Sequence, residues 1–103
     1  MAVIDLIRSK EKTAFSFELL PPLKGNSIEK LYATIDILKE YNPLYINITN
    51  HQSDNCRRPC TVAIAAAIHN RYNIPVVPHV TCSGYTQEEI EYMLLDLQFL
   101  GIT

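Results

Sequence analysis

The sequence predicts an α/β fold, the first three strand-helix units of a (β/α)8 TIM barrel, incomplete at this length. Short β-forming runs alternate three times with helical stretches, and each unit has roughly 30 residues, the length of a βαβ step. Right-handed crossovers make such strands parallel. A closed barrel typically needs about 250 residues, whereas the sequence has 103. We expect residues 1–103 to form one partial barrel domain.

The composition is that of an ordinary globular chain, with 48% hydrophobic and 19% charged residues. A net charge of −2 without a basic stripe argues against a nucleic-acid partner. No apolar stretch approaches the roughly 18 residues that span a membrane, and the first residues do not resemble a signal peptide. We therefore expect a cytoplasmic protein without a membrane partner, whose three cysteines are free thiols.

The first strand is predicted around residues 13–19 and carries a carboxylate to its end. Phe15 and Phe17 alternate with polar residues, which is the period of a strand, and two consecutive prolines stop it. A carboxylate at the carboxyl end of a barrel strand is a candidate for chemistry, and here that residue is Glu18. Periodicity alone allows a second interpretation, in which Glu18 is a solvated residue of an edge strand.

Helical spacing of apolar residues predicts four helices. A short one over residues 3–7 is expected to cover one end of the sheet. The second begins after Ser27, a natural N-cap, and ends near Tyr41, because a proline follows closely. The third runs over residues 61–73, and a capping box at residues 86–89 begins the fourth. We expect the buried face of this last helix to consist of Ile90, Met93, Leu94, Leu97 and Leu100.

The second and third strands are predicted over residues 44–49 and 74–81, and prolines shorten the paired part of the third. The polar stretch 50–59 lacks periodicity and is expected to be a loop, long enough to be functional. The carboxyl ends of parallel strands meet at one rim of a barrel. The polar residues expected to converge there are Glu18, Thr49, Asn50, His79 and Thr81.

Four segments of the sequence form a recognisable series: Phe15-Ser-Phe-Glu-Leu-Leu-Pro-Pro22, Tyr45-Ile-Asn-Ile-Thr49, Arg58-Pro-Cys-Thr-Val-Ala63 and Pro78-His-Val-Thr-Cys82. Their order and spacing resemble those of the methylenetetrahydrofolate reductase family. From about Thr13 to its last residue the sequence resembles that family. The resemblance implies a flavoprotein oxidoreductase of one-carbon metabolism and methionine biosynthesis, in which NAD(P)H reduces FAD. The flavin then reduces 5,10-methylenetetrahydrofolate to 5-methyltetrahydrofolate.

The resemblance also implies roles for individual residues. Glu18 matches the general acid that protonates the folate, so that its five-membered ring opens to an iminium. This role needs a carboxyl group still protonated near neutral pH, which a site shielded from water favours. Thr49 and Asn50 match cofactor-binding positions near the flavin and nicotinamide, and His79 matches a flavin contact. Relatives commonly carry a Thr-Tyr-Gly segment where this sequence has Thr49-Asn50-His51, and glycine permits closer backbone approach.

Alternative interpretations accompany several of these residues. Without the resemblance, the favoured interpretation of His79 is a buried histidine whose ring is hydrogen-bonded to a backbone carbonyl. Cys82 is expected to be a small buried residue. The pair Arg57 and Arg58 fits either a phosphate or folate contact or a solvated loop. No metal site is expected, because the C-x3-C spacing lacks the usual paired knuckles. The residues considered for such a site are His51, Asp54, Cys56 and Cys60.

The sequence is compatible with three functions. The first is the N-terminal portion of a folate-reducing oxidoreductase that uses FAD and NAD(P)H. The second is a truncated, non-catalytic α/β domain that associates through its open sheet edges as a homo-oligomer, because unpaired edges are adhesive. The third is another barrel enzyme with a strand-end glutamate, which would bind a phosphorylated substrate and no flavin.

Overall fold

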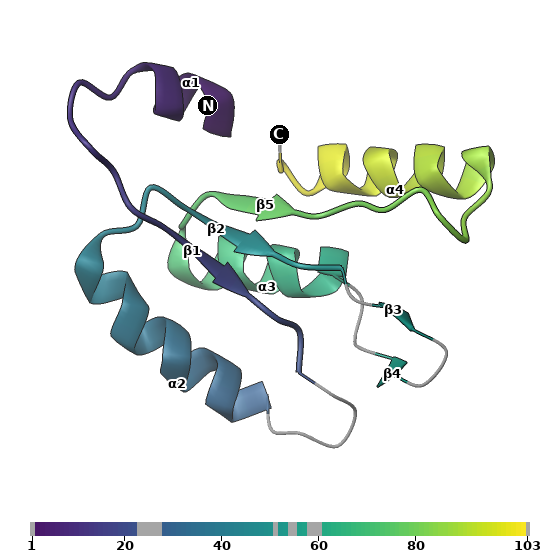
Figure 1. The fold of residues 1–103 in the computed structure, drawn as a ribbon, viewed down its shortest axis with the longest axis horizontal. Coiled ribbons are helices and arrows are strands. Elements are labelled where there is room, and N and C mark those ends of the chain that lie inside the picture. Colours follow the sequence, from purple (N-terminus) through teal and green to yellow (C-terminus); the bar gives the residue numbers. More distant parts are fainter. Residues whose placement is uncertain (1, 23–27, 51, 54–55, 58–60, 103) are drawn as a thin grey trace.

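A three-stranded parallel sheet forms the centre of the fold (Figure 1). This computed structural model describes residues 2–22, 28–50, 52–53, 56–57 and 61–102. The strands are β1 (Ser16–Leu19), β2 (Tyr45–Ile48) and β5 (Val76–Pro78). Their order is β1-β2-β5, and β2 pairs in parallel with both neighbours. The predicted α/β class, an open sheet corresponding to part of a (β/α) barrel, is therefore confirmed.

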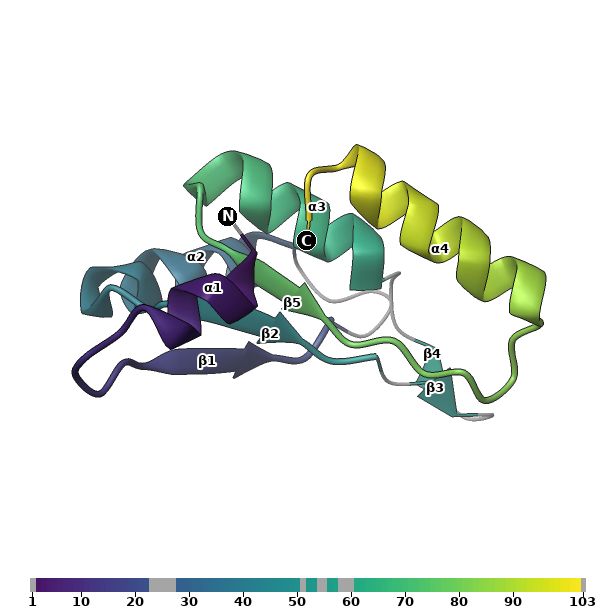
Figure 2. The same cartoon turned by 90° about the horizontal axis from the view of Figure 1, so that it is seen from above.

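The helices lie where the sequence places them. They are α1 (Val3–Arg8), α2 (Ile28–Leu38) with the short 3-10 helix η1 (Lys39–Tyr41), α3 (Thr61–Tyr72) and α4 (Gln87–Phe99). Asn42 ends the second helical segment in the left-handed region, with φ 52°, because Pro43 disfavours continuation. Helices α2, α3 and α4 lie on one side of the sheet, and no helix of the described ranges covers the other side (Figure 2).

Alternation along the strands separates a core face from an open face. Leu19, Ile46, Ile48 and Val76 are buried against the helices. Residues of opposite parity, including Glu18 and its register partner Asn47, therefore lie on the face without helices. Helices α2 and α3 complete the core with buried Ile35, Ala65 and Ile68.

The capping box of α4 is confirmed, but the predicted buried face of this helix is largely wrong. The Glu89 amide donates to Thr86 Oγ1 over 3.1 Å, and the Thr86 amide donates to Glu89 Oε2 over 3.1 Å. Leu97 is buried, whereas Leu94 and Leu100 are exposed and Ile90 and Met93 are half-buried. Among the described residues, the main packing partner of α4 is α3.

The stretch between β2 and α3 contains a feature that the sequence did not reveal. Strands β3 (Gln52–Ser53) and β4 (Cys56–Arg57) pair antiparallel, so the prediction of a simple loop is wrong there. Strands of two residues are too short to show a period. The residues considered for a metal site, the two arginine side chains and the Ser27 cap lie outside the part whose side chains are described.

Cys82 also departs from expectation, because it is exposed and not buried. It begins a turn in which the Tyr85 amide donates to the Cys82 carbonyl over 3.3 Å. Gly84 occupies the left-handed region of this turn with φ 82°. The chain has left the sheet by this point, so the thiol has no core to enter.

Helix α1 lies near the amino ends of the strands, as expected for a covering element (Figures 1 and 2). Val3 and Leu6 face a cavity of about 430 Å³ that Pro75 and Ile102 also line. None of the residues of α1 is buried, so this helix packs only weakly on the end of the sheet.

An aromatic and cationic cluster joins α2 to the end of α3. The Arg71 guanidinium lies 4.1 Å from the Tyr32 ring centroid, a cation–π distance. The Tyr72 hydroxyl donates to the Tyr32 carbonyl over 3.3 Å. Burial raises the pKa of the Tyr72 phenol, and the nearby Asp36 carboxylate raises it further.

Two isoleucines of α2 provide a matched test of which helix face carries the core. Ile35 is fully buried, whereas Ile37 is 65% exposed. We expect Ile35→Ala to lower the free energy of unfolding by about 2–5 kcal/mol, through lost burial and a cavity. Ile37→Ala should change it by no more than about 0.5 kcal/mol. Denaturant unfolding of both variants measures this, and equal losses would contradict the assigned core.

Candidate functional site

An acid in one strand and an imidazole just beyond the end of another meet on the open face of the sheet. Glu18 lies in β1, and His79 directly follows β5, on the opposite side of β2. The gap between Glu18 Oε1 and His79 Nε2 is 4.0 Å. The side chains are 57% and 39% exposed, respectively. The structure therefore brings together the two residues on which the predicted site depends.

Asn47 lies between them and was not among the predicted site residues. Its strand position is in register with Glu18, and its Oδ1 lies 3.4 Å from His79 Nε2. His79 is half-buried and its ring contacts a side-chain amide, so the interpretation as a fully buried histidine is wrong. The available signal was an amide within the apolar strand Tyr45–Ile48, since asparagine is depleted from strands.

Backbone hydrogen bonds continue the sheet beyond the last strand residues and fix the ends that carry the site. The His79 amide donates to the Ile48 carbonyl over 2.8 Å, and the Thr49 amide donates to the Leu19 carbonyl over 3.0 Å. His79 and Thr49 are therefore held by main-chain geometry although neither belongs to a strand. The backbone positions of Glu18, Asn47 and His79 are thereby held relative to one another.

Thr49 is held from a second direction by the start of α3. The buried Thr61 hydroxyl donates to the Thr49 carbonyl over 3.1 Å. The Thr49 hydroxyl oxygen is itself buried, and among the described residues it has no hydrogen-bond partner. A buried hydroxyl without a partner costs free energy unless a ligand or water satisfies it.

Asn50 and Thr81 connect the segments that follow β2 and β5. The Asn50 amide donates from Nδ2 to Thr81 Oγ1 over 3.3 Å. The predicted convergence of strand-end residues thus extends to this pair. Asn50 is half-buried and Thr81 is exposed, so the link lies at the edge of the site.

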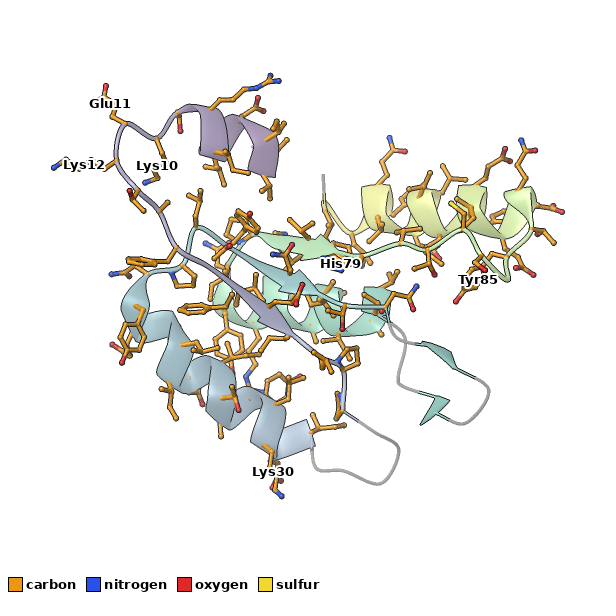
Figure 3. All side chains as sticks on the ribbon, viewed as in Figure 1. Lys10, Glu11, Lys12, Lys30, His79 and Tyr85 are labelled. Atoms are coloured by element: carbon orange, nitrogen blue, oxygen red, sulfur yellow. The ribbon has the colours of Figure 1, made fainter. Side chains whose placement is uncertain are left out.

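Two lysines of the described chain lie away from the site. His79 lies at the carboxyl end of β5, whereas Lys10 and Lys12 belong to the linker after α1, near the other end of the sheet (Figure 3). Within the described ranges, no group of three acidic, histidine or cysteine side chains is placed to hold a metal ion. A carboxyl, an imidazole and an amide on one face can transfer a proton and bind a polar ligand.

None of the helices in the described segments is both long enough and apolar enough to cross a membrane.

Comparison with known proteins places these features in a family. The family model described as methylenetetrahydrofolate reductase matches residues 3–103. The chain is 31% identical over 99% of its length to "Methylenetetrahydrofolate reductase (NADH) 1" of Arabidopsis thaliana. It is 36% identical over 79% of its length to the 5,10-methylenetetrahydrofolate reductase of Buchnera aphidicola. It is 29% identical over 84% of its length to the Escherichia coli protein of that name.

The chain spans only part of these relatives, namely 18% of the Arabidopsis protein, 28% of the Buchnera protein and 29% of the Escherichia coli protein. The matched region contains β1, β2 and β5 with all the residues of the site described above. The chain belongs to the methylenetetrahydrofolate reductase family.

Proposed function

We propose that this chain is the N-terminal portion of a flavin-dependent enzyme that reduces 5,10-methylenetetrahydrofolate to 5-methyltetrahydrofolate with NAD(P)H. Family membership supports the reaction class. The observation that carries the proposal is the approach of Glu18 to His79, 4.0 Å apart on one open face of a parallel sheet. The proposal includes a cytoplasmic location and a small-molecule substrate, and the charge of −2 without a basic stripe argues against a nucleic-acid partner.

Glu18 acts in this proposal as the proton donor. Its carboxyl proton moves to a nitrogen of the folate five-membered ring, and the bond from that nitrogen to the bridging carbon breaks. The bridging carbon then forms an iminium with the other nitrogen and can accept hydride. Glu18 is more than half exposed in the described part of the chain, so substrate and cofactor over this face must exclude water to keep the carboxyl protonated.

Residues at the strand ends fit a bound flavin. The Thr49 hydroxyl is buried without a partner in the described structure, and a polar ligand would satisfy it. Asn50 and His79, at the ends of β2 and β5, supply an amide and an imidazole that can donate or accept hydrogen bonds. When bound, FAD accepts electrons from NAD(P)H and supplies them to the folate. The chain's own residues bind and orient the cofactor there.

A second candidate function rests on the edges of the sheet. The bond from Ile46 N to Pro75 O and the bond from His79 N to Ile48 O direct alternate residues of β5 toward β2. Val76 and Pro78 therefore face the free edge, which among the described residues pairs with nothing. Such an edge can join a second copy in a non-catalytic homo-oligomer, although Pro78 lacks an amide donor and weakens this pairing.

Visible absorption and light scattering of the purified chain distinguish the two functions. The proposed enzyme portion should acquire a flavin absorption band when purified with added FAD, through contacts at the strand ends. A colourless oligomer that excludes FAD would favour association through the sheet edges instead. A colourless protein that binds a phosphorylated compound would indicate another barrel enzyme.

Replacing the proposed acid should separate the two half-reactions. We expect Glu18→Gln to slow folate reduction by about 10²- to 10⁴-fold, because the amide cannot supply a proton. Reduction of the flavin by NAD(P)H should change little. Stopped-flow absorption of the flavin band in the active enzyme measures both steps. Glu40→Gln, on the exposed η1 segment, is the matched control and should affect neither. Equal loss in both half-reactions would argue against the acid role.

Two histidines allow a matched test of the cofactor wall. His79→Leu removes one hydrogen bond, so it should weaken FAD binding about tenfold, as measured by quenching of flavin fluorescence. His69→Leu should leave FAD binding unchanged, because His69 lines the cavity beneath α1 near the amino ends of the strands. An unchanged affinity in His79→Leu would exclude the proposed contact.

A further inference from the structure

Asn47 is a polar residue at the centre of the open face of the sheet. It belongs to the middle strand β2, where the two registers place it between Glu18 of β1 and Val77 of β5. Its side chain is half-buried. Asparagine is depleted from strands, and its amide needs hydrogen-bond partners that apolar neighbours do not supply.

The amide of Asn47 has an acceptor end and a donor end. The acceptor, Oδ1, lies 3.4 Å from His79 Nε2. The donor, Nδ2, has no hydrogen-bond partner among the described residues. The unpartnered polar atoms that are sealed from solvent there are Thr49 Oγ1 and His69 Nδ1, so Asn47 Nδ2 stays accessible from the open face. A ligand on this face can therefore reach it.

We infer that Asn47 is a specificity-determining residue that contacts the ligand and donates from Nδ2 to the carbonyl oxygen of a ring lactam. A ring lactam is a carbonyl group beside a ring N–H, and flavin and pterin rings both contain one. The inference deepens the proposed function and rests on it, because it states how the same site selects its ligands.

Sheet geometry fixes the direction of this donor. Ile46 and Ile48, the neighbours of Asn47 along β2, are fully buried against the helices. Successive side chains of a strand point to opposite faces, so Asn47 points to the face that carries Glu18 and His79. Glu18 is its register partner. A ligand that contacts Glu18 in the proposed reaction therefore also comes within reach of the Asn47 amide.

The chemistry of the donor determines which ring it favours. A side-chain amide is uncharged, and its nitrogen donates but does not accept. A lactam carbonyl accepts, so it pairs with Nδ2. An amino group in the same place is itself a donor and leaves both groups unpaired, which costs free energy in a site closed to water. A site built around one such hydrogen bond therefore rejects the analogue that lacks the acceptor.

Two pterin compounds that differ at one group test the inference. Folic acid has a carbonyl at position 4 of its ring, whereas aminopterin has an amino group there. We expect Asn47→Asp to lower the ratio of the folic acid affinity to the aminopterin affinity about tenfold, the effect of one hydrogen bond. Equilibrium dialysis measures both affinities. The variant keeps an oxygen for the His79 ring, so a residue that served His79 alone would leave this ratio unchanged.

A second measurement distinguishes flavin from pterin as the source of the lactam. Asn47→Leu removes the donor without adding charge. If the flavin supplies the carbonyl, this variant should weaken FAD binding about tenfold in flavin fluorescence quenching, while the pterin ratio of Asn47→Asp stays unchanged. If the pterin supplies it, the pterin ratio should fall and FAD affinity should hold.

Asn70→Asp is the matched control, because it makes the same exchange of amide for carboxylate at an exposed position of α3. It should alter neither the pterin ratio nor FAD affinity. Should Asn47→Asp not fold, Asn47→Ala also removes the donor and should lower the ratio likewise.

An unchanged pterin ratio together with an unchanged FAD affinity in the Asn47 variants overturns the inference and leaves the proposed function standing. An unmodified chain that binds neither FAD nor folic acid rejects the proposed function, and the role of Asn47 is rejected with it.

Discussion

The parallel pairing of β2 with both β1 and β5 is the constraint on which the site depends. Since β2 is central, one register places Glu18 beside Asn47, and the other places His79 one residue beyond the ladder. The same pairings direct Ile46 and Ile48 into the core. A slip of one residue would reverse both faces at once, burying the polar groups and exposing the isoleucines. Core packing therefore stabilises the arrangement of the acid, amide and imidazole.

Local sequence patterns predict most of the helices and strands, but they do not predict which side chains of the outer helix α4 are buried. The alternation before Glu18, the pre-proline end after Tyr41 and the capping box at Thr86 each predict an element that the structure contains. The apolar stripe of α4 also has helical period, yet Leu94 remains 53% exposed. Periodicity indicates which residues share a face of the helix. Burial of that face also requires a second element that packs on it, and the sequence of the helix does not identify this element.

The candidate site shows the same division. Strand-end positions were predictable because parallel strands deliver their carboxyl ends to one rim. Asn47 was not predicted because it lies within a strand, whereas the predicted site residues were those at the strand ends. Its relation to Glu18 depends on the register between two strands that are far apart in sequence. A polar residue inside an apolar strand was the local signal, and alternation would have placed it on the face of Glu18.

The residues of the site are also held in different ways, and this bears on the segment where the chain departs from its family's usual sequence. Main-chain bonds of the sheet fix the spacing of Glu18, Asn47 and His79. Asn50 depends on one side-chain bond to Thr81 at the edge. Glycine permits closer backbone approach than the residues that follow Thr49 in this sequence. In the function proposed above, this departure bears on the approach of the cofactor, whereas the strand pairings that place Glu18 and His79 lie outside it.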